Sequence, residues 1–126
     1  DILSLLLLDI TERHTEKHPG HQKMSQIRQY LDEHYTEKFS LDALSEHFFI
    51  SKYHLSREFR SLYGITLNHY VIARRITLAK KLLRFSDYTL EQIAENCGFY
   101  DSSYLNRQFK KSEGISASDF RKKWIN

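Results

Sequence analysis

Apolar residues recur every three or four positions along most of the chain, which is the spacing of a helix with one buried face. Serine or threonine N-caps, and glycines that suit left-handed C-caps, divide this pattern into separate helices. The pattern predicts an all-α fold in which two helix-turn-helix subdomains are joined by a long linker helix, with an extra N-terminal helical segment. The expected bounds are about 40–64 for the first helix-turn-helix, 66–84 for the linker helix, 89–114 for the second helix-turn-helix and 116–124 for a final helix.

The first 23 residues differ in composition from the rest of the chain. Residues 2–18 are typical of an apolar helix that becomes polar, and Pro19-Gly20 then predicts a break, with residues 14–23 as a linker. The apolar run is shorter than the roughly 18 residues that span a membrane, and it lacks the features of a signal peptide. We therefore expect no membrane partner. We interpret residues 1–23 as the tail or linker of an upstream domain that is missing from this chain, and residues 24–126 as one domain.

A stretch of 18 residues that begins at Tyr53 has a counterpart fifty positions later, beginning at Ser103. Leu, Arg, Phe, Gly and Ile recur in register between the two copies, and each copy follows a short predicted helix. Each unit therefore has the order helix, turn, helix. The turn of the second copy, CGFYDSS, is expected to be one residue longer than that of the first. Cys97, beside this turn, is expected to be a small buried apolar residue.

The second helix of each copy carries a polar and cationic stripe opposite its apolar one. Leu55 and Phe59 face inward in the first copy, as Leu105 and Phe109 do in the second, which leaves the arginines outside. An arginine on such a helix can donate two hydrogen bonds to O6 and N7 of guanine. We predict base contacts from Tyr53, Ser56, Arg57, Ser102, Ser103, Asn106 and Arg107. We predict phosphate contacts from Ser40, Lys52, Arg60, Arg74, Thr89, Lys110 and Lys111.

The net charge of +3 is unevenly distributed along the chain. Residues 24–50 carry two basic and five acidic side chains, whereas residues 51–86 carry eight basic and one acidic. The basic part suits a polyanion such as double-stranded DNA. A linker helix of about 18 residues is roughly 27 Å long, which can hold two recognition helices near the roughly 34 Å repeat of the major groove. Arg75, which falls among apolar residues of this helix, is expected to be structural and paired with Glu46 or Glu95.

The stretch GFYDSSYLNRQFKKSEGISASDFRK, with RITLAKKLL before it, resembles the C-terminal DNA-binding domain of the AraC/XylS family of bacterial transcription regulators. The resemblance covers residues 24–124 and departs from the family at Ala117, where a proline is usual. It implies a non-enzymatic, sequence-specific reader of two adjacent major grooves at a promoter, often an activator that contacts RNA polymerase. It also implies an upstream sensor or dimerisation domain. A cytoplasmic location agrees with the single cysteine.

Three other interpretations differ from this one in a feature that can be examined. A helical module that binds another protein through its basic face would lack the steep salt dependence of phosphate contacts. The similar module of a DNA-repair methyltransferase would be accompanied by a nucleophilic cysteine and a metal-binding cysteine cluster, and Cys97 alone cannot supply both. His14, His18 and His21 could indicate a metal site, but with no cysteine nearby we interpret them as linker histidines. We expect no enzyme activity, cofactor or metal.

Overall fold

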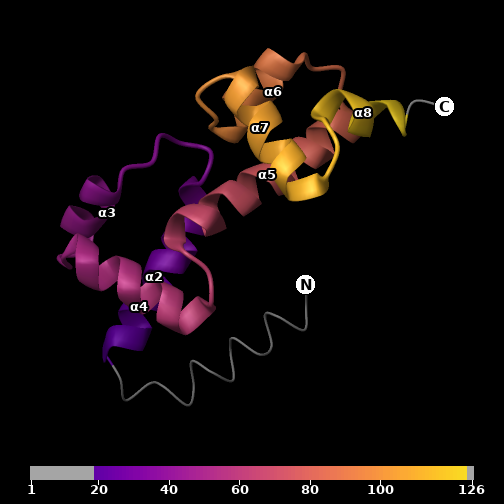
Figure 1. Cartoon of the computed structure of the whole chain (residues 1–126). Helices are drawn as coiled ribbons and strands as arrows, with labels where there is room; N and C mark the ends of the chain where they lie inside the picture. The colour runs from indigo at the N-terminus through magenta and orange to yellow at the C-terminus, as the bar shows by residue number, and fades with distance from the viewer. Residues whose placement is uncertain (1–18, 125–126) are drawn as a thin grey trace. The chain divides into compact units, whose positions relative to one another are not determined.

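The computed structural model describes residues 19–124, and every regular element in that range is an α-helix. The helices are α2 (Pro19–His34), α3 (Leu41–His47), α4 (Lys52–Tyr63), α5 (Leu67–Phe85), α6 (Leu90–Cys97), α7 (Ser102–Glu113) and α8 (Ala117–Lys122) (Figure 1). The prediction of an all-α fold with two helix-turn-helix motifs is confirmed. The predicted N-terminal helical segment, with His14 and His18, lies outside the described residues.

The chain divides into two compact units, each with one helix-turn-helix. Within the described residues, unit 1 comprises 19–33 and 40–67 and contains the pair α3 and α4, whereas unit 2 comprises 34–39 and 68–124 and contains the pair α6 and α7. The prediction that the second turn is longer is wrong, because residues 48–51 and 98–101 both form connections of four residues. The extra residue lies in α6 instead, which has 8 residues where α3 has 7.

The helix α2 begins earlier than the sequence pattern predicts. The break expected at Pro19-Gly20 is absent, since both residues belong to the first turn of α2. Proline suits that position, because the N–H group it lacks would have no partner inside the helix. Residues 19–23, which we assigned to a linker, are therefore helical.

Unit 1 buries apolar side chains from α2, α3, α4 and the first residue of α5, and α3 and α4 have well-defined caps. The hydroxyl groups of Ser40 and Ser51 accept hydrogen bonds from the backbone N–H groups of Ala43 (3.3 Å) and His54 (3.1 Å), at the starts of α3 and α4. Gly64 ends α4 with φ of 79°, as predicted. These caps fix the ends of α4, whose inner face is apolar. The buried apolar residues of unit 1 are Met24, Ile27, Leu31, Leu44, Leu55, Phe59 and Leu67.

Unit 2 has one apolar core, to which α5, α6, α7, α8 and the α6–α7 turn contribute. Thr89 begins α6 with the predicted capping box: its hydroxyl accepts from the N–H of Gln92 (3.1 Å), and the Gln92 side chain accepts from the N–H of Thr89 (2.9 Å). Gly98 ends α6 with φ of 93°, and a Cβ atom there would lie 2.6 Å from the carbonyl oxygen of Thr36. The turn therefore requires glycine. The core residues are Ile76, Ala79, Leu83, Ile93, Ala94, Cys97, Phe99, Leu105, Phe109 and Ala117.

Two arginines of unit 2 donate hydrogen bonds to backbone carbonyl groups distant in the sequence. Buried Arg75 donates from Nε to the carbonyl of Tyr35 (2.6 Å) and from Nη2 to that of Glu37 (2.9 Å). The structural role predicted for Arg75 is therefore correct, but the partners predicted for it, Glu46 and Glu95, are wrong. Carbonyl groups after a helix end have no intrahelical partner, and a buried guanidinium satisfies them.

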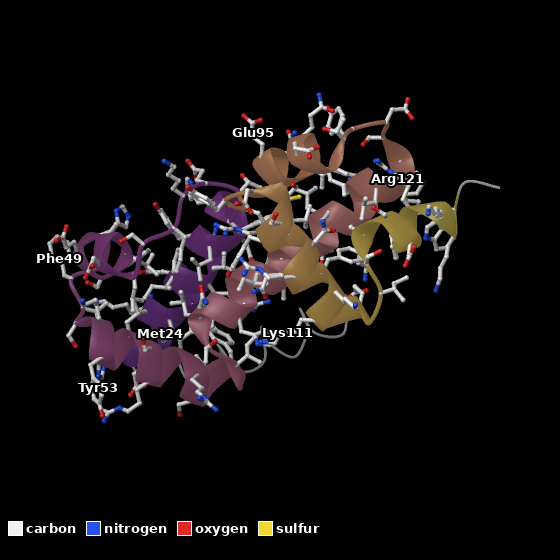
Figure 2. The ribbon with its side chains drawn as sticks, turned by 45° about the horizontal axis from the view of Figure 1, so that its top comes forward. Met24, Phe49, Tyr53, Glu95, Lys111 and Arg121 are labelled. Carbon is white, nitrogen blue, oxygen red and sulfur yellow. The ribbon has the colours of Figure 1, made fainter. Side chains whose placement is uncertain are left out.

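Arg121 has the corresponding role at the end of α5 (Figure 2). Its guanidinium donates to four carbonyl groups, at distances from 2.7 to 3.5 Å. These acceptors belong to Leu82, Leu83, Ser86 and Tyr88. Arg121 thus closes the last turn of α5 and holds the loop that leads to α6. Among the described residues, no helix is long and apolar enough to cross a membrane.

Candidate nucleic-acid interface

The outer face of α4 presents the side chains that the sequence pattern placed there. Tyr53, Ser56, Arg57 and Arg60 are exposed on this face, and Figure 2 shows Tyr53 projecting from the helix. The opposite face is anchored in the core of unit 1, as predicted from its apolar spacing. The guanidinium carbon of Arg57 lies 5.2 Å from the centroid of the Tyr53 ring, a cation–π distance. The exposed face of α4 therefore offers a cation, a hydroxyl group and an aromatic ring side by side.

The outer face of α7 has residue types similar to those of α4, but some of its side chains are partly buried. Ser103 and Arg107 are exposed, whereas Ser102 and Asn106 are half-buried. The Oδ1 atom of Asn106 is buried and has no hydrogen-bond partner among the described residues. The Arg107 guanidinium carbon lies 5.5 Å from the centroid of the Tyr104 ring. Each unit thus pairs its predicted base-reading arginine with a tyrosine of the same helix.

Five of the seven residues predicted to contact phosphate fall into two groups. Arg60, Lys110 and Lys111 are exposed cations on or beside the outer faces of α4 and α7. Ser40 and Thr89 are exposed N-caps, and their hydroxyl groups are engaged by backbone N–H groups of their own helices. A helix N-terminus of this kind attracts an anion through its remaining N–H groups.

The last two predicted phosphate contacts, Lys52 and Arg74, already have neighbours in the free protein. Lys52 forms an exposed ion pair with Asp42 (2.7 Å), and the hydrogen bond to that carboxylate raises the pKa of Lys52. An exposed ion pair is weak, so it leaves Lys52 available to a phosphate. Arg74 is half-buried, and its guanidinium carbon lies 5.2 Å from the centroid of the Tyr35 ring.

A cleft of about 870 Å³ in unit 2 lies beside the start of α7 and has a different character. Glu91, Glu95 and Asp101 line it, together with the buried guanidinium of Arg75 (Figure 2 marks Glu95). These three carboxylates outnumber the two cations of the lining, Arg75 and Lys38, so the cleft is less suited to a phosphate backbone than a cationic face is. The cationic outer face of α7 is the better candidate in this unit.

Reasoning from the sequence assigned no site role to Tyr104, and it did not predict the exposed aromatic rings of Phe49 and Tyr100 at the two turns. Phe49 is 91% exposed and has φ of 54°, a conformation that favours glycine. Tyr100 is 94% exposed in the corresponding turn of unit 2. Tyr104 lies under Arg107, and the spacing of three residues on one helix was a signal that could have identified it.

The single cysteine of the chain lies in unit 2. Cys97 is buried in the core of unit 2, as predicted, and burial raises its pKa to about 12. The thiol is therefore protonated and unreactive at neutral pH. Within residues 19–124, no group of three or more His, Cys, Asp or Glu side chains could hold a metal ion.

Two helix-turn-helix units, each with an exposed cationic stripe on its second helix, define a class of protein with a duplicated DNA-binding motif. The sequence matches the profile of the helix-turn-helix domain family over residues 44–123. The chain belongs to this family, in its AraC/XylS group, as the motifs at the second recognition helix predicted.

Relatives of known sequence agree with this assignment. The chain is 35% identical over 98 residues to the uncharacterized HTH-type transcriptional regulator YijO of Escherichia coli K12, covering 78% of this chain and 35% of that protein. It is 33% identical over 99 residues to the HTH-type transcriptional activator RhaS of Salmonella schwarzengrund, covering 79% and 36%. The chain therefore spans about a third of the length of these curated relatives.

Solved structures show the same fold. The DNA-binding domain of AdpA, a global transcriptional factor whose crystal structure contains a target DNA, has a TM-score of 0.75 at 29% identity, covering 80% of this chain and 91% of that one. The C-terminal domain of the two-component response regulator yesN of Fusobacterium nucleatum has a TM-score of 0.74 at 34% identity, covering 77% and 95%.

Proposed function

We propose that this chain binds double-stranded DNA sequence-specifically at bacterial promoters, with α4 and α7 as recognition helices in two adjacent major grooves. The observation that carries the proposal is the outer face of each helix, where exposed arginine and small polar side chains stand opposite a fully apolar inner face. Such a face can approach base edges closely, because its inner residues remain in the core. The family membership and the DNA complex of AdpA support it.

The base and phosphate assignments follow from the chemistry and exposure of each side chain. Arg57 and Arg107 would each donate two hydrogen bonds to a guanine, whereas Asn106, whose Oδ1 is buried, would contact a base by donating from its amide N–H groups. The small hydroxyl groups beside them, of Ser56, Ser102 and Ser103, would allow close approach, and Tyr53 could contact a thymine methyl group. The phosphate contacts would come from Ser40, Lys52, Arg60, Arg74, Thr89, Lys110 and Lys111.

The regulatory context is also part of the proposal. The curated relatives are about three times as long as the matched region, which supports a further sensor or dimerisation domain in the intact protein. The name of RhaS supports a role as a transcription activator, and activation would bring the bound protein into contact with RNA polymerase. With DNA as the proposed target, the activity would take place in the bacterial cytoplasm.

The test is DNA binding by alanine variants across a salt series. Arg57→Ala and Arg107→Ala should each cost about 1–3 kcal/mol on an operator selected from random duplexes and relax the preference at one base pair. Lys111→Ala should weaken the operator and a random duplex alike, and reduce the salt slope by about one. Lys122→Ala, which removes an exposed cation of α8 outside the proposed interface, is the matched control and should change affinity least.

Two outcomes would contradict the proposal. If Arg57→Ala and Arg107→Ala weaken both duplexes equally, these arginines contact phosphate and the assigned reading of bases is wrong. If none of the three variants differs from Lys122→Ala, the duplicated units do not bind DNA through these faces, and a protein-interaction module becomes the better interpretation.

A further inference from the structure

Arg57 and Arg107 each lie over a tyrosine ring of their own helix, but the two rings have different surroundings. The distances are similar, 5.2 Å to Tyr53 and 5.5 Å to Tyr104. Tyr53 is 74% exposed and projects from α4 (Figure 2). Tyr104 is half-buried and packs against the core of unit 2. One arginine therefore rests on an exposed ring and the other on a supported one.

The contacts that support Tyr104 lead through Phe99 to Arg75, a buried arginine of unit 2. The Tyr104 ring lies 5.9 Å from the ring of Phe99, which is buried. The guanidinium carbon of Arg75 lies 5.9 Å from the Phe99 centroid, and its hydrogen bonds to two backbone carbonyls fix it in place. Arg75, Phe99, Tyr104 and Arg107 thus form a continuous series of cation–π and tilted aromatic contacts from the interior of unit 2 to the outer face of α7.

A supported ring limits the positions that Arg107 can adopt before DNA is present. A long cationic side chain loses considerable rotamer entropy when it binds in one geometry, and pre-organisation reduces that loss. The supported ring also keeps the Arg107 guanidinium from moving to a phosphate or a neighbouring base when another base replaces the expected guanine. Arg57 keeps this freedom, because Tyr53 can move together with it. Supporting contacts of this kind determine how precisely a binding group is held in its productive geometry.

We infer that Tyr104 is a positioning residue that holds the Arg107 guanidinium for a guanine, so that unit 2 discriminates its guanine more strictly than unit 1 does. The inference rests on the proposed DNA-binding function. It assigns to Tyr104 a role in base specificity without a base contact of its own.

The test measures base discrimination by the full chain on a selected operator. Arg57→Ala and Arg107→Ala are first compared on all single-base-pair variants of the operator, which identifies the pair that each arginine reads. At the pair assigned to Arg107, Tyr104→Leu should reduce the ratio of Kd values for A·T and G·C by about two- to fivefold, the range expected for one exposed cation–π contact. Tyr104→Phe keeps the aromatic face and should retain the ratio.

Tyr53→Leu is the matched variant in unit 1. At the pair read by Arg57 it should change the ratio less than Tyr104→Leu does at its own pair, because the exposed Tyr53 ring can move with Arg57 and restrains it weakly. Loss of the base contact proposed for Tyr53 itself would be seen at a different base pair, so the comparison uses only the pair that Arg57→Ala identifies. Equal effects of Tyr53→Leu and Tyr104→Leu would overturn the claim that unit 2 is stricter. If Tyr104→Leu weakens the random duplex as much as the operator, its role is structural only, and the positioning inference is wrong.

The Arg107→Ala and Tyr104→Leu variants together distinguish a failure of this inference from a failure of the proposed DNA-binding function. If Arg107→Ala leaves every base preference unchanged, Arg107 is not a reader and both proposals fail for unit 2. If Arg107→Ala removes one preference and Tyr104→Leu leaves it intact, the proposed function stands and the positioning inference alone is overturned.

A measurement on the unmodified free protein covers the case in which Tyr104→Leu does not fold. Aromatic ring currents shift protons above a ring face, so the side-chain protons of Arg107 should be displaced upfield more than those of Arg57. The Nε–H group of Arg107 should also be the more ordered of the two on the picosecond to nanosecond timescale. Equal shifts and equal order for both arginines would overturn the inference.

Discussion

Units 1 and 2 carry the same motif but are held together by different contacts. In unit 2, Arg75 and Arg121 donate hydrogen bonds to backbone carbonyls that lie 33 to 40 positions away in the sequence. In unit 1, the ion pair between Lys52 and Asp42 is exposed on both sides. Charge-assisted bonds in a partly buried setting stabilise a fold far more than an exposed ion pair does. We therefore expect unit 2 to be the more rigid of the two.

The two turns show the same contrast. Unit 2 places Gly98 where the chain needs a positive φ and buries the following Phe99. Unit 1 places Phe49 in a left-handed conformation and leaves its ring exposed. The repeat therefore preserves the recognition helix and its C-cap, whereas the residues that constrain the turn differ between the copies. A repeated motif predicts a shared function, but its rigidity depends on residues outside the repeat.

The largest expected effect comes from removing the Arg75 side chain. Arg75→Ala should lower the free energy of unfolding by about 3 kcal/mol, because bonds from a charged donor contribute about 1.5–3 kcal/mol each and two carbonyls lose their partner. Urea unfolding followed by the fluorescence of Trp124, the single tryptophan, reports on unit 2. Lys81→Ala, an exposed cation on the same helix, is the control. A loss as small as that of the control would show that Arg75 does not stabilise unit 2.

A smaller effect should distinguish the glycines that end α4 and α6. Gly64→Ala should cost about 1 kcal/mol, because its only penalty is a left-handed backbone and no atom lies within 4 Å of the added Cβ. Gly98→Ala should cost about 2 kcal/mol or slightly more, since its Cβ would also meet the Thr36 carbonyl oxygen at 2.6 Å. Chemical denaturation of both variants gives the comparison. Equal losses would mean that the segment after α2 yields easily and does not brace the turn of unit 2.

Local features of both units were predictable from the sequence, whereas the contacts that distinguish the units were not. The caps at Ser40, Thr89 and Gly64 depend on residues within three or four positions, so short-range pattern was sufficient. The exposure of Arg57 followed from helical periodicity in the same way. The acceptors of Arg75 are backbone groups, which no residue type reveals, and this is why the predicted carboxylate partners were wrong.

The candidate site shows the same limit. On α7, Asn106 was predicted to face outward and Ser102 to contact a base, yet both side chains are half-buried. Their covering depends on tertiary packing around the start of α7, which helical spacing alone does not describe. The support of Tyr104 by Phe99 is likewise a contact between a turn and a helix, and only the folded chain brings it about.

The smallest expected effect comes from changing Phe49 in the turn of unit 1, which tests whether this turn is strained where that of unit 2 is not. Phe49→Gly should be more stable than Phe49→Ala by roughly 0.5–1 kcal/mol, because alanine keeps the left-handed strain while glycine relieves it at some cost in backbone entropy. Neither change removes much buried surface, since the Phe49 ring is 91% exposed, so the pair isolates the backbone contribution. Amide hydrogen exchange in α4 measures the difference within unit 1. DNA affinity should be the same for both variants, because Phe49 is outside the proposed interface. If alanine proves as stable as glycine, the φ of 54° carries no strain, and the turn of unit 1 is as well adapted to its sequence as that of unit 2.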